Sequence, residues 1–223
     1  IKIKTKQKAD SYEIRIDGGL ISSAGSWTAA SLSNEPGLIA VISNRKVFGL
    51  YGDAVQKSLI KAGFKPFVHL IGDGERFKNL KTLENTLNFL SESRLTRTDA
   101  VIALGGGVVG DLTGFAASVY LRGIEFLQVP TTLLSMIDSS VGGKTGINSS
   151  FGKNLIGAFY QPRGVLIDTE VLATMPPREL TAGFCEAVKQ GAIGGRKLFD
   201  KTAGFLERFD RSLLAAGEDN RIF

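Results

Sequence analysis

The stretch Gly105-Gly106-Gly107-Val108-Val109-Gly110-Asp111 decides the fold, because it joins a strand pattern to a helix pattern. The preceding residues 100–104 form a continuous apolar run, which is typical of a strand buried on both faces of a parallel sheet. Gly105, Gly107 and Gly110 satisfy the spacing G-x-G-x-x-G. Such glycines let the backbone approach a pyrophosphate at the N-terminus of a helix. The stretch predicts a nucleotide-binding turn, with a tight ligand-free turn as the alternative.

Strand and helix signals alternate on both sides of this turn. Alternation of polar and apolar residues predicts a strand at residues 11–16, and short apolar runs predict strands at residues 38–42, 67–71, 126–129 and 165–167. Apolar spacings of three and four predict helices over residues 47–62 and through Leu80, Leu83, Leu87 and Leu90. We therefore expect a Rossmann-like parallel α/β sheet with helices on both faces. In the common Rossmann order the glycine-rich turn follows the first strand, whereas here about three predicted strands precede it.

The pattern changes at Met175-Pro176-Pro177, after which the sequence carries no strand signal. Apolar residues at helical spacing follow in two groups, Leu180, Phe184 and Val188 and then Leu198, Phe199, Leu206 and Phe209. We predict an α/β domain over residues 1–175 and the beginning of an all-helical domain over residues 176–223.

The composition limits the class of protein. Of the 223 residues, 43% are hydrophobic and 22% are charged, which excludes a disordered or fibrous chain. The single cysteine, Cys185, excludes a disulfide framework and favours an intracellular, cytoplasmic setting. No apolar run is long enough to cross a membrane. The net charge is +5. The alternating basic run of Lys2, Lys4, Lys6 and Lys8 indicates only the solvated face of an edge strand. The sequence has no basic stripe with interleaved aromatic residues, so nucleic-acid binding is not expected.

A second glycine-rich cluster covers residues 138–146. Gly143-Lys144-Thr145 is similar to the end of a Walker A loop, but Asp138 stands where that motif requires glycine, so a P-loop is excluded. We predict a flexible loop that offers Lys144, Thr145 and backbone N–H groups to a phosphate or carboxylate. Lys153 and Asn154 follow closely and are predicted to face the same anion.

Three further features are weaker alone. Glu186 and Lys189 lie three residues apart, so they share a helix face, and a surface ion pair is the simpler interpretation. The segment from Asp73 to Lys78 follows a predicted strand, where ligand loops of α/β proteins lie. His69, the only histidine, lies inside an apolar strand, which predicts a packed core side chain. One histidine and one cysteine cannot form a usual zinc site.

Together these motifs resemble the 3-dehydroquinate synthase family over residues 11–193. The strings that carry the resemblance are residues 105–111, 122–124, 129–134, 138–146, 152–157, 175–180 and 183–191. The resemblance implies an N-terminal NAD-binding α/β domain and a helical C-terminal domain with metal and substrate groups. It implies a cytoplasmic lyase of the shikimate pathway of aromatic amino acid biosynthesis that acts on 3-deoxy-D-arabino-heptulosonate 7-phosphate. In that reaction NAD oxidises the C5 hydroxyl, phosphate is eliminated, NADH returns the hydride, and an aldol step closes the ring.

The resemblance also implies roles for individual residues. The implied NAD contacts are Asn44, Asp73, Glu75, Lys78, Gly106, Gly107, Val108, Val109, Gly110, Asp111, Thr131, Thr132, Lys144, Lys153, Val171, Leu172 and Thr174. The implied substrate-binding and catalytic residues are Asp138, Lys144, Asn154 and Lys189. Arg122 is similar to an arginine that reaches a phosphate across a homodimer interface. Glu186 is similar to the first ligand of a divalent metal, zinc or cobalt.

The family completes its metal site with two histidines, and this chain contains only His69. The sequence also lacks an initial methionine. We therefore expect a truncated part of a longer enzyme that does not turn over by itself. Three alternatives stay open: a related sugar-phosphate cyclase such as 2-deoxy-scyllo-inosose synthase, a polyol or iron-dependent alcohol dehydrogenase, and a non-catalytic NAD-binding module.

Overall fold

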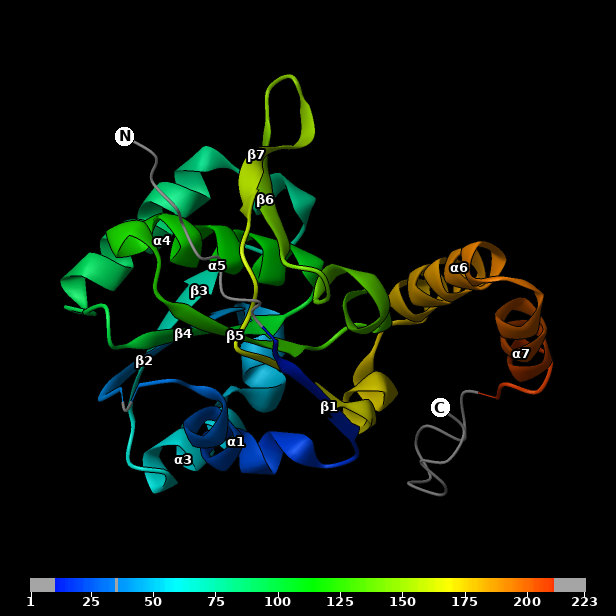
Figure 1. Ribbon diagram of the computed structural model, residues 1–223, viewed down its shortest axis with the longest axis horizontal. Helices are drawn as coiled ribbons and strands as arrows, with labels where there is room; N and C mark the ends of the chain where they lie inside the picture. The colour runs from blue at the N-terminus through cyan, green and yellow to red at the C-terminus, as the bar shows by residue number, and fades with distance from the viewer. Residues whose placement is uncertain (1–10, 35, 211–223) are drawn as a thin grey trace, which may run out of the picture.

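A six-stranded parallel sheet forms the centre of the molecule (Figure 1). The computed structural model describes residues 11–34 and 36–210, so the basic run from Lys2 to Lys8 lies outside the described residues. The strand order is β1-β8-β5-β4-β2-β3. The strands are, in that order, β1 (Glu13–Asp17), β8 (Gly164–Asp168), β5 (Glu125–Pro130), β4 (Ala100–Gly105), β2 (Leu38–Asn44) and β3 (Lys65–Ile71). The predicted parallel α/β sheet is confirmed.

Helices cover both faces of the sheet and divide its core in two. Alternate residues of β2 show the division, since Ile39 and Val41 pack in one apolar cluster and Ala40 and Ile42 in the other. The first cluster is covered by η1 (Leu20–Ser23), α1 (Ala24–Ser31) and α3 (Asp53–Lys61). The second is covered by α4 (Leu80–Glu92) and α5 (Gly107–Val119). Strands with apolar side chains on both faces contribute to both clusters, as the continuous apolar runs predict.

The two edge strands differ from the prediction in their burial. The strand predicted at residues 11–16 forms as β1, but Ile14 and Ile16 are 38% and 58% exposed. β1 pairs only with β8 and no described helix covers these side chains. His69 in β3 is half-buried rather than a core residue, because β3 is the opposite edge. Its ring stacks on Phe89 with centroids 4.8 Å apart, so the side chain is packed but the predicted core position is wrong.

The helix predicted over residues 47–62 begins two residues earlier and contains a π turn. It runs through α2 (Arg45–Val47), the π-helical η2 (Phe48–Gly52) and α3. The Asn44 side chain caps it by accepting a hydrogen bond from the Val47 backbone N at 2.8 Å. In α4 the predicted stripe is buried at Leu83 and Leu90 and partly buried at Leu87, whereas Leu80, the first helical residue, is 57% exposed.

The flexible loop predicted around Lys144 is wrong, because the chain forms an antiparallel hairpin there. Its strands are β6 (Lys144–Ser149) and β7 (Gly152–Phe159), and the hairpin projects from the molecule in Figure 1. Gly157 permits the close pairing of the two strands, since a Cβ at this position would lie 2.1 Å from the Thr145 backbone O. Ile147 anchors the hairpin in the second apolar cluster. The hairpin therefore gives Lys144 and Asn154 fixed positions.

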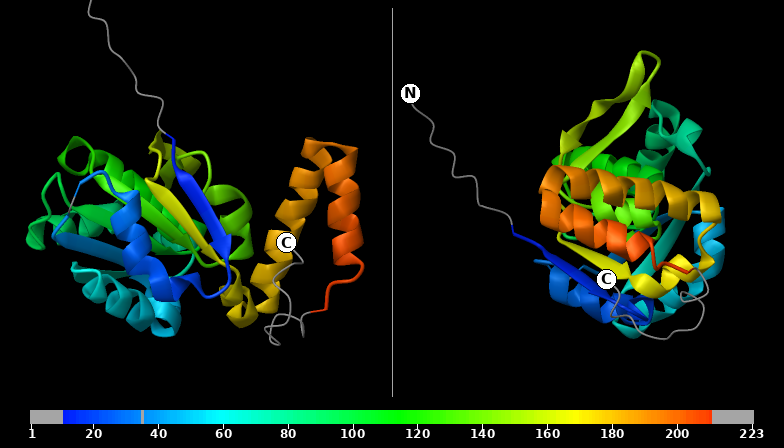
Figure 2. Two further views of the ribbon diagram at one scale, coloured as in Figure 1. Left: turned by 60° about the horizontal axis from the view of Figure 1, so that its bottom comes forward. Right: turned by 90° about the vertical axis from the view of Figure 1, so that its right-hand side faces the viewer.

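Two helices follow Pro176 and stand beside the sheet in Figure 2. They are α6 (Pro177–Gly194) and α7 (Arg196–Leu206), and Pro177 occupies the first helical position. α6 joins the core through Leu180 and through Gly183, where a Cβ would lie 2.5 Å from the Leu133 Cβ. Across the described parts of the chain, no helix combines the length and the apolar character that crossing a membrane requires. The division into domains at residue 176 stays a prediction.

Candidate active site

The glycine-rich turn lies at the point where the strand order reverses. β3 lies on one side of β2, and β4, β5 and β8 follow on the other side. Ligands of open α/β sheets bind at such a switch point, outside the carboxyl ends of the strands. Here β2 ends at Asn44 and β4 ends at Gly105. The glycine-rich turn therefore lies where proteins with open α/β sheets bind their ligands.

The glycines of this turn hold the first turn of α5 close to its neighbours. A Cβ at Gly106 would lie 3.0 Å from Thr132 Cγ2, and a Cβ at Gly107 would lie 3.0 Å from Ser139 Oγ. The helix begins at Gly107, so its unpaired backbone N–H groups face the carboxyl edge of the sheet. These N–H groups and the helix dipole favour an anion. The predicted strand-to-helix turn is confirmed as a structure.

Asn44 and Asp73 meet at the same edge. Asn44 Nδ2 donates to Asp73 Oδ1 at 3.2 Å, while Asn44 Oδ1 caps the following helix. Asp73 lies in the loop after β3, and η3 (Glu75–Phe77) follows it. Asn44 and Asp73, which lie 29 positions apart in the sequence, are therefore hydrogen-bonded to each other on one side of the crevice.

Thr131 supplies a second wall after β5. Its backbone N donates to Gly105 O at 3.0 Å, which holds it against the glycine-rich turn. Its hydroxyl is buried and has no hydrogen-bond partner within the described residues. A buried hydroxyl without a partner costs free energy unless a ligand or water satisfies it. Thr132 is paired instead, since its Oγ1 lies 2.8 Å from Ser135 Oγ.

The segment after β8 contributes Thr174 to the same edge. Val171 and Leu172 lie in the 3-10 helix η6 (Thr169–Thr174), and both side chains are buried in the core. They can contact a ligand only through their backbone, and Val109 is buried in the same way. Thr174 hydrogen-bonds Tyr51, whose hydroxyl also donates to Val171 O at 3.3 Å. Burial raises the pKa of Tyr51. Tyr51 lies in the helix predicted over residues 47–62 and was not predicted as a site residue.

A buried charged group lies between the hairpin and α5. Lys78, whose side chain is 6% exposed, forms an ion pair with Asp111. Lys78 Nζ also donates to Asn154 Oδ1 at 2.5 Å. Burial raises the pKa of Asp111, although Lys78 opposes the shift. Three predicted site residues from separate elements are thus joined in one hydrogen-bonded group, which we call the Lys78 group.

A second charged group joins the hairpin base to α6. Lys144 Nζ lies 3.7 Å from Asp138 Oδ1, and Lys189 forms an ion pair with Glu186. The Lys189 hydrogen bond holds the pKa of Glu186 below its ordinary value, and Glu186 raises the pKa of Lys189. Gln190 donates to Glu186 Oε1 at 2.9 Å. The two pairs also interact electrostatically, because Lys144 lowers the Glu186 pKa further and Asp138 raises that of Lys189.

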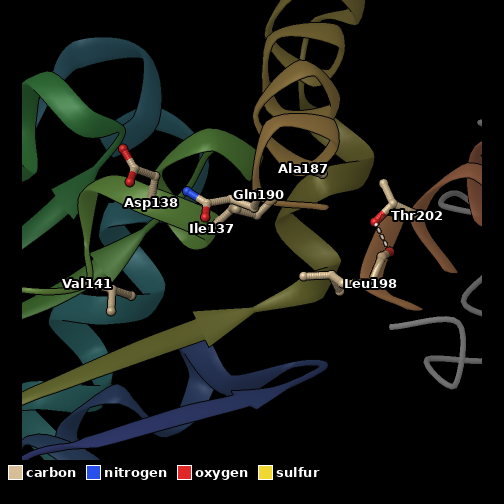
Figure 3. A pocket seen from close by; sticks show the side chains of 7 residues that line it. All are labelled: Ile137, Asp138, Val141, Ala187, Gln190, Leu198 and Thr202. Carbon is tan, nitrogen blue, oxygen red and sulfur yellow. Dashed lines mark hydrogen bonds between the residues drawn. The ribbon is translucent and has the colours of Figure 1, made fainter. Parts of the chain in front are cut away.

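Two clefts meet at Asp138. One, of about 420 Å³, lies against the hairpin, and its lining includes Asp111, Asp138, Lys144, Thr145, Asn154 and Phe159. The other, of about 490 Å³, is lined by Ile137, Asp138, Val141, Ala187, Gln190, Leu198 and Thr202 (Figure 3). Asp138 lines both clefts, so it lies between the hairpin and α6.

The structure does not bring every predicted residue to this region. Arg122 is exposed after the C-terminal end of α5, while the glycine-rich turn is at the N-terminal end. A 13-residue helix separates the two by about 20 Å. Lys153 is exposed on β7. Within residues 11–34 and 36–210, His, Cys, Asp and Glu side chains form no group of three that could hold a metal ion.

The fold and the site define an α/β protein of Rossmann-like architecture with a charged cleft beside the glycine-rich turn. A sequence model described as 3-dehydroquinate synthase N-terminal matches residues 68–182, just over half of the chain. The 3-dehydroquinate synthase of Rippkaea orientalis is 50% identical over 201 residues, which are 90% of this chain and 54% of that protein. The chain therefore belongs to the 3-dehydroquinate synthase family. It spans about half the length of the curated relatives that it matches.

Two solved structures show the same architecture. The 2-epi-5-epi-valiolone synthase of Streptomyces hygroscopicus subsp. jinggangensis, with NAD⁺ and Zn²⁺ bound, has a TM-score of 0.81 and 29% identity. The match covers 96% of this chain and 57% of that one. A 2-deoxy-scyllo-inosose synthase complexed with carbaglucose-6-phosphate, NAD⁺ and Co²⁺ has a TM-score of 0.73 and 31% identity, covering 80% of this chain and 48% of that one.

Proposed function

We propose that this chain carries the nucleotide-binding half of a 3-dehydroquinate synthase. The enzyme would convert 3-deoxy-D-arabino-heptulosonate 7-phosphate to 3-dehydroquinate and phosphate. The observation that carries the proposal is the proximity of two sites. The glycine-rich turn at the switch point lies beside a cleft that contains Asp111, Asp138, Lys144 and Asn154. Family membership and the two structures with bound NAD⁺ support it.

The residues at the crevice fit NAD. The N-terminus of α5 can hold the pyrophosphate, and the orphaned Thr131 hydroxyl can donate a hydrogen bond to the cofactor. The bond from Asn44 orients the Asp73 carboxylate at the same edge, where it can accept from a ribose hydroxyl. Bound NAD would supply reversible hydride transfer, so that a transient ketone makes the elimination of phosphate possible.

The cleft residues fit an anionic substrate. We assign Lys144, Lys189 and Asn154 to the substrate phosphate and its neighbouring hydroxyls, since the two ammonium groups supply charge and Asn154 supplies an amide. The Asp138 carboxylate, 3.7 Å from Lys144, holds that ammonium in the cleft. Lys78 fixes Asn154 from the buried side. These groups bind and orient the substrate; the cofactor supplies the redox chemistry.

Glu186 is the residue that we assign to a divalent metal, either zinc or cobalt. Its carboxylate is polarised by Lys189 and Gln190 and lies on α6 beside the cleft. One carboxylate does not make a metal site, and the described residues hold no larger group.

We further propose a cytoplasmic homodimer. Arg122 is exposed at the far end of α5, and we assign it to a substrate phosphate in the partner subunit. The assignment of Arg122, the dimer and the cellular location stay predictions.

The proposal is tested with the protein expressed from its complete gene, supplied with NAD and Zn²⁺ or Co²⁺. We expect phosphate release from 3-deoxy-D-arabino-heptulosonate 7-phosphate and little from glucose 6-phosphate. The second candidate is a 2-deoxy-scyllo-inosose synthase, which the solved structure at 31% identity favours. Selective turnover of glucose 6-phosphate would establish that candidate, and NAD binding without turnover of either compound would indicate a non-catalytic module.

A further inference from the structure

One side chain joins the loop after β3 to the hairpin. Asn148 is half-buried near the end of β6. Its backbone N donates to Lys78 O at 2.8 Å, and its Nδ2 donates to Glu75 Oε1 at 2.7 Å. Its Oδ1 accepts from the backbone N of Asn154 at 2.9 Å. Asn148 therefore contacts the predicted cofactor loop on one side and the predicted substrate residue on the other.

The chemistry of these partners requires a side chain at position 148 that both donates and accepts hydrogen bonds. A carboxylate can only accept a hydrogen bond, and a backbone N–H can only donate one. The side chain between Glu75 and the Asn154 N–H must therefore donate and accept at the same time. Asparagine does both, aspartate keeps only the acceptor, and alanine keeps neither.

Asn154 needs such a partner because its backbone is in the left-handed region, with φ of +57°. Asparagine tolerates this conformation better than other residues with side chains, but it still adopts it rarely. The Asn148 bond fixes the Asn154 backbone, and the Lys78 bond then fixes the Asn154 amide. The direction in which Asn154 presents its side chain to the cleft thus depends on both neighbours.

We propose that Asn148 is a positioning residue for the substrate phosphate. It holds Asn154 in its left-handed conformation and connects it to Glu75 and Lys78, so that the loop and the hairpin keep one relative position. The inference rests on the proposed function in one respect, namely that Asn154 binds the substrate.

The kinetic test compares Asn148→Ala, Asn154→Ala and the double variant in the protein expressed from its complete gene. Loss of one hydrogen-bonded anchor is expected to raise the KM for heptulosonate phosphate about tenfold, with a smaller change in kcat. Because Asn148 acts through Asn154, Asn148→Ala is expected to have no further effect in the Asn154→Ala background. Additive effects on KM would overturn the proposal.

Ser149→Ala is the matched control. It removes another hydrogen bond of the same hairpin, from the Phe151 backbone N to Ser149 Oγ at 3.2 Å, without touching Asn154. We expect the KM of this variant to stay within about twofold of the original. An equal rise in KM for Ser149→Ala and Asn148→Ala would show a general loosening of the hairpin and would contradict the proposal.

Hydrogen exchange tests the inference independently of activity. In Asn148→Ala without ligands, the Asn154 amide is expected to exchange about tenfold faster, while the same amide in Ser149→Ala exchanges at the original rate. An unchanged Asn154 amide would overturn the inference even in an active enzyme. An inactive original protein with the expected exchange would overturn the proposed function and leave the positioning of Asn154 established.

Discussion

At the scale of the residue, Lys78 shows how strongly one side chain can be tied to a fold. Its side chain is almost completely buried. The ammonium group forms an ion pair with the Asp111 carboxylate and donates a hydrogen bond to Asn154 Oδ1. An ammonium group leaves water only when its partners replace the lost hydration. Its ion pair lies beside the proposed substrate cleft, so stability and binding depend on the same contacts.

Lys78→Met is therefore expected to lower the free energy of unfolding by about 3 kcal/mol, because it leaves the Asp111 carboxylate buried without its cation. Urea unfolding measures the loss. Lys81→Met is the control, since the Lys81–Glu84 pair is exposed and is worth about 0.5 kcal/mol or less. Equal losses in the two variants would show that the Lys78 ion pair contributes no more than a surface pair.

His69 provides a pH-dependent prediction. Burial lowers its pKa below the ordinary value of 6.5, because the folded state disfavours the charged ring. Below pH 6.5 the unfolded chain then binds more protons than the folded chain, so the His69 contribution is present above 6.5 and is lost as pH falls. The stability of the original protein relative to His69→Gln is expected to decrease between about pH 7.5 and about pH 5. A difference that does not change with pH would contradict this assignment.

At the scale of the element, α1 and α3 cross at a glycine. Gly25 N donates to Ser58 Oγ at 2.9 Å, and a Cβ at Gly25 would lie 2.0 Å from the Ser58 backbone O. The contact is with backbone, so the helices must separate to admit a methyl group. The crossing holds both helices against the first apolar cluster.

Gly25→Ala is expected to lower the free energy of unfolding by about 2 kcal/mol, as overpacking does elsewhere. Gly49→Ala is a suitable comparison, because Gly49 lies in the helical run after β2 and nothing lies within 4 Å of its added Cβ. That variant is expected to be neutral or slightly stabilising. Thermal or urea unfolding of both variants decides the point, and a tolerated Gly25→Ala would refute the close crossing.

The elements also show what the sequence could and could not predict. β4 and β5 were predictable because strands buried on both faces have continuous apolar runs. The hairpin was not, because its pairing depends on a close approach of Gly157 to Thr145, which leaves no periodic apolar signal. The exposure of β1 was also unpredictable, since alternation reveals a face and not what covers it.

The candidate site, like the elements, was predictable only where the signal is local in the sequence. Gly106, Asp111 and Lys144 were found from local motifs. In the structure Gly106 is the N-cap of α5, and Asp111 and Lys144 line the cleft against the hairpin. Tyr51 and Asn148 were missed as site residues, because their roles come from partners 123 and 73 positions away. A π turn ending at Gly52 marks Tyr51 in the structure, but the sequence has no sign of it.

At the scale of the whole molecule, three parts of the chain converge on the carboxyl edge of one sheet. The sheet supplies the nucleotide crevice, the hairpin supplies Lys144 and Asn154, and α6 supplies Glu186 and Lys189. α6 reaches Asp138 because it packs closely on Leu133 through Gly183. The proposed function requires this convergence, because a reaction that recycles NAD needs the cofactor and an anionic substrate side by side.

The most direct test of this account is the stoichiometry of the reaction. The protein from the complete gene is given heptulosonate phosphate in large excess over NAD, with phosphate and NADH measured together. We expect phosphate to accumulate until the substrate is consumed, with no net NADH, because the hydride returns in each turnover. NADH accumulation in step with substrate oxidation, or NAD binding without phosphate release, would contradict the account.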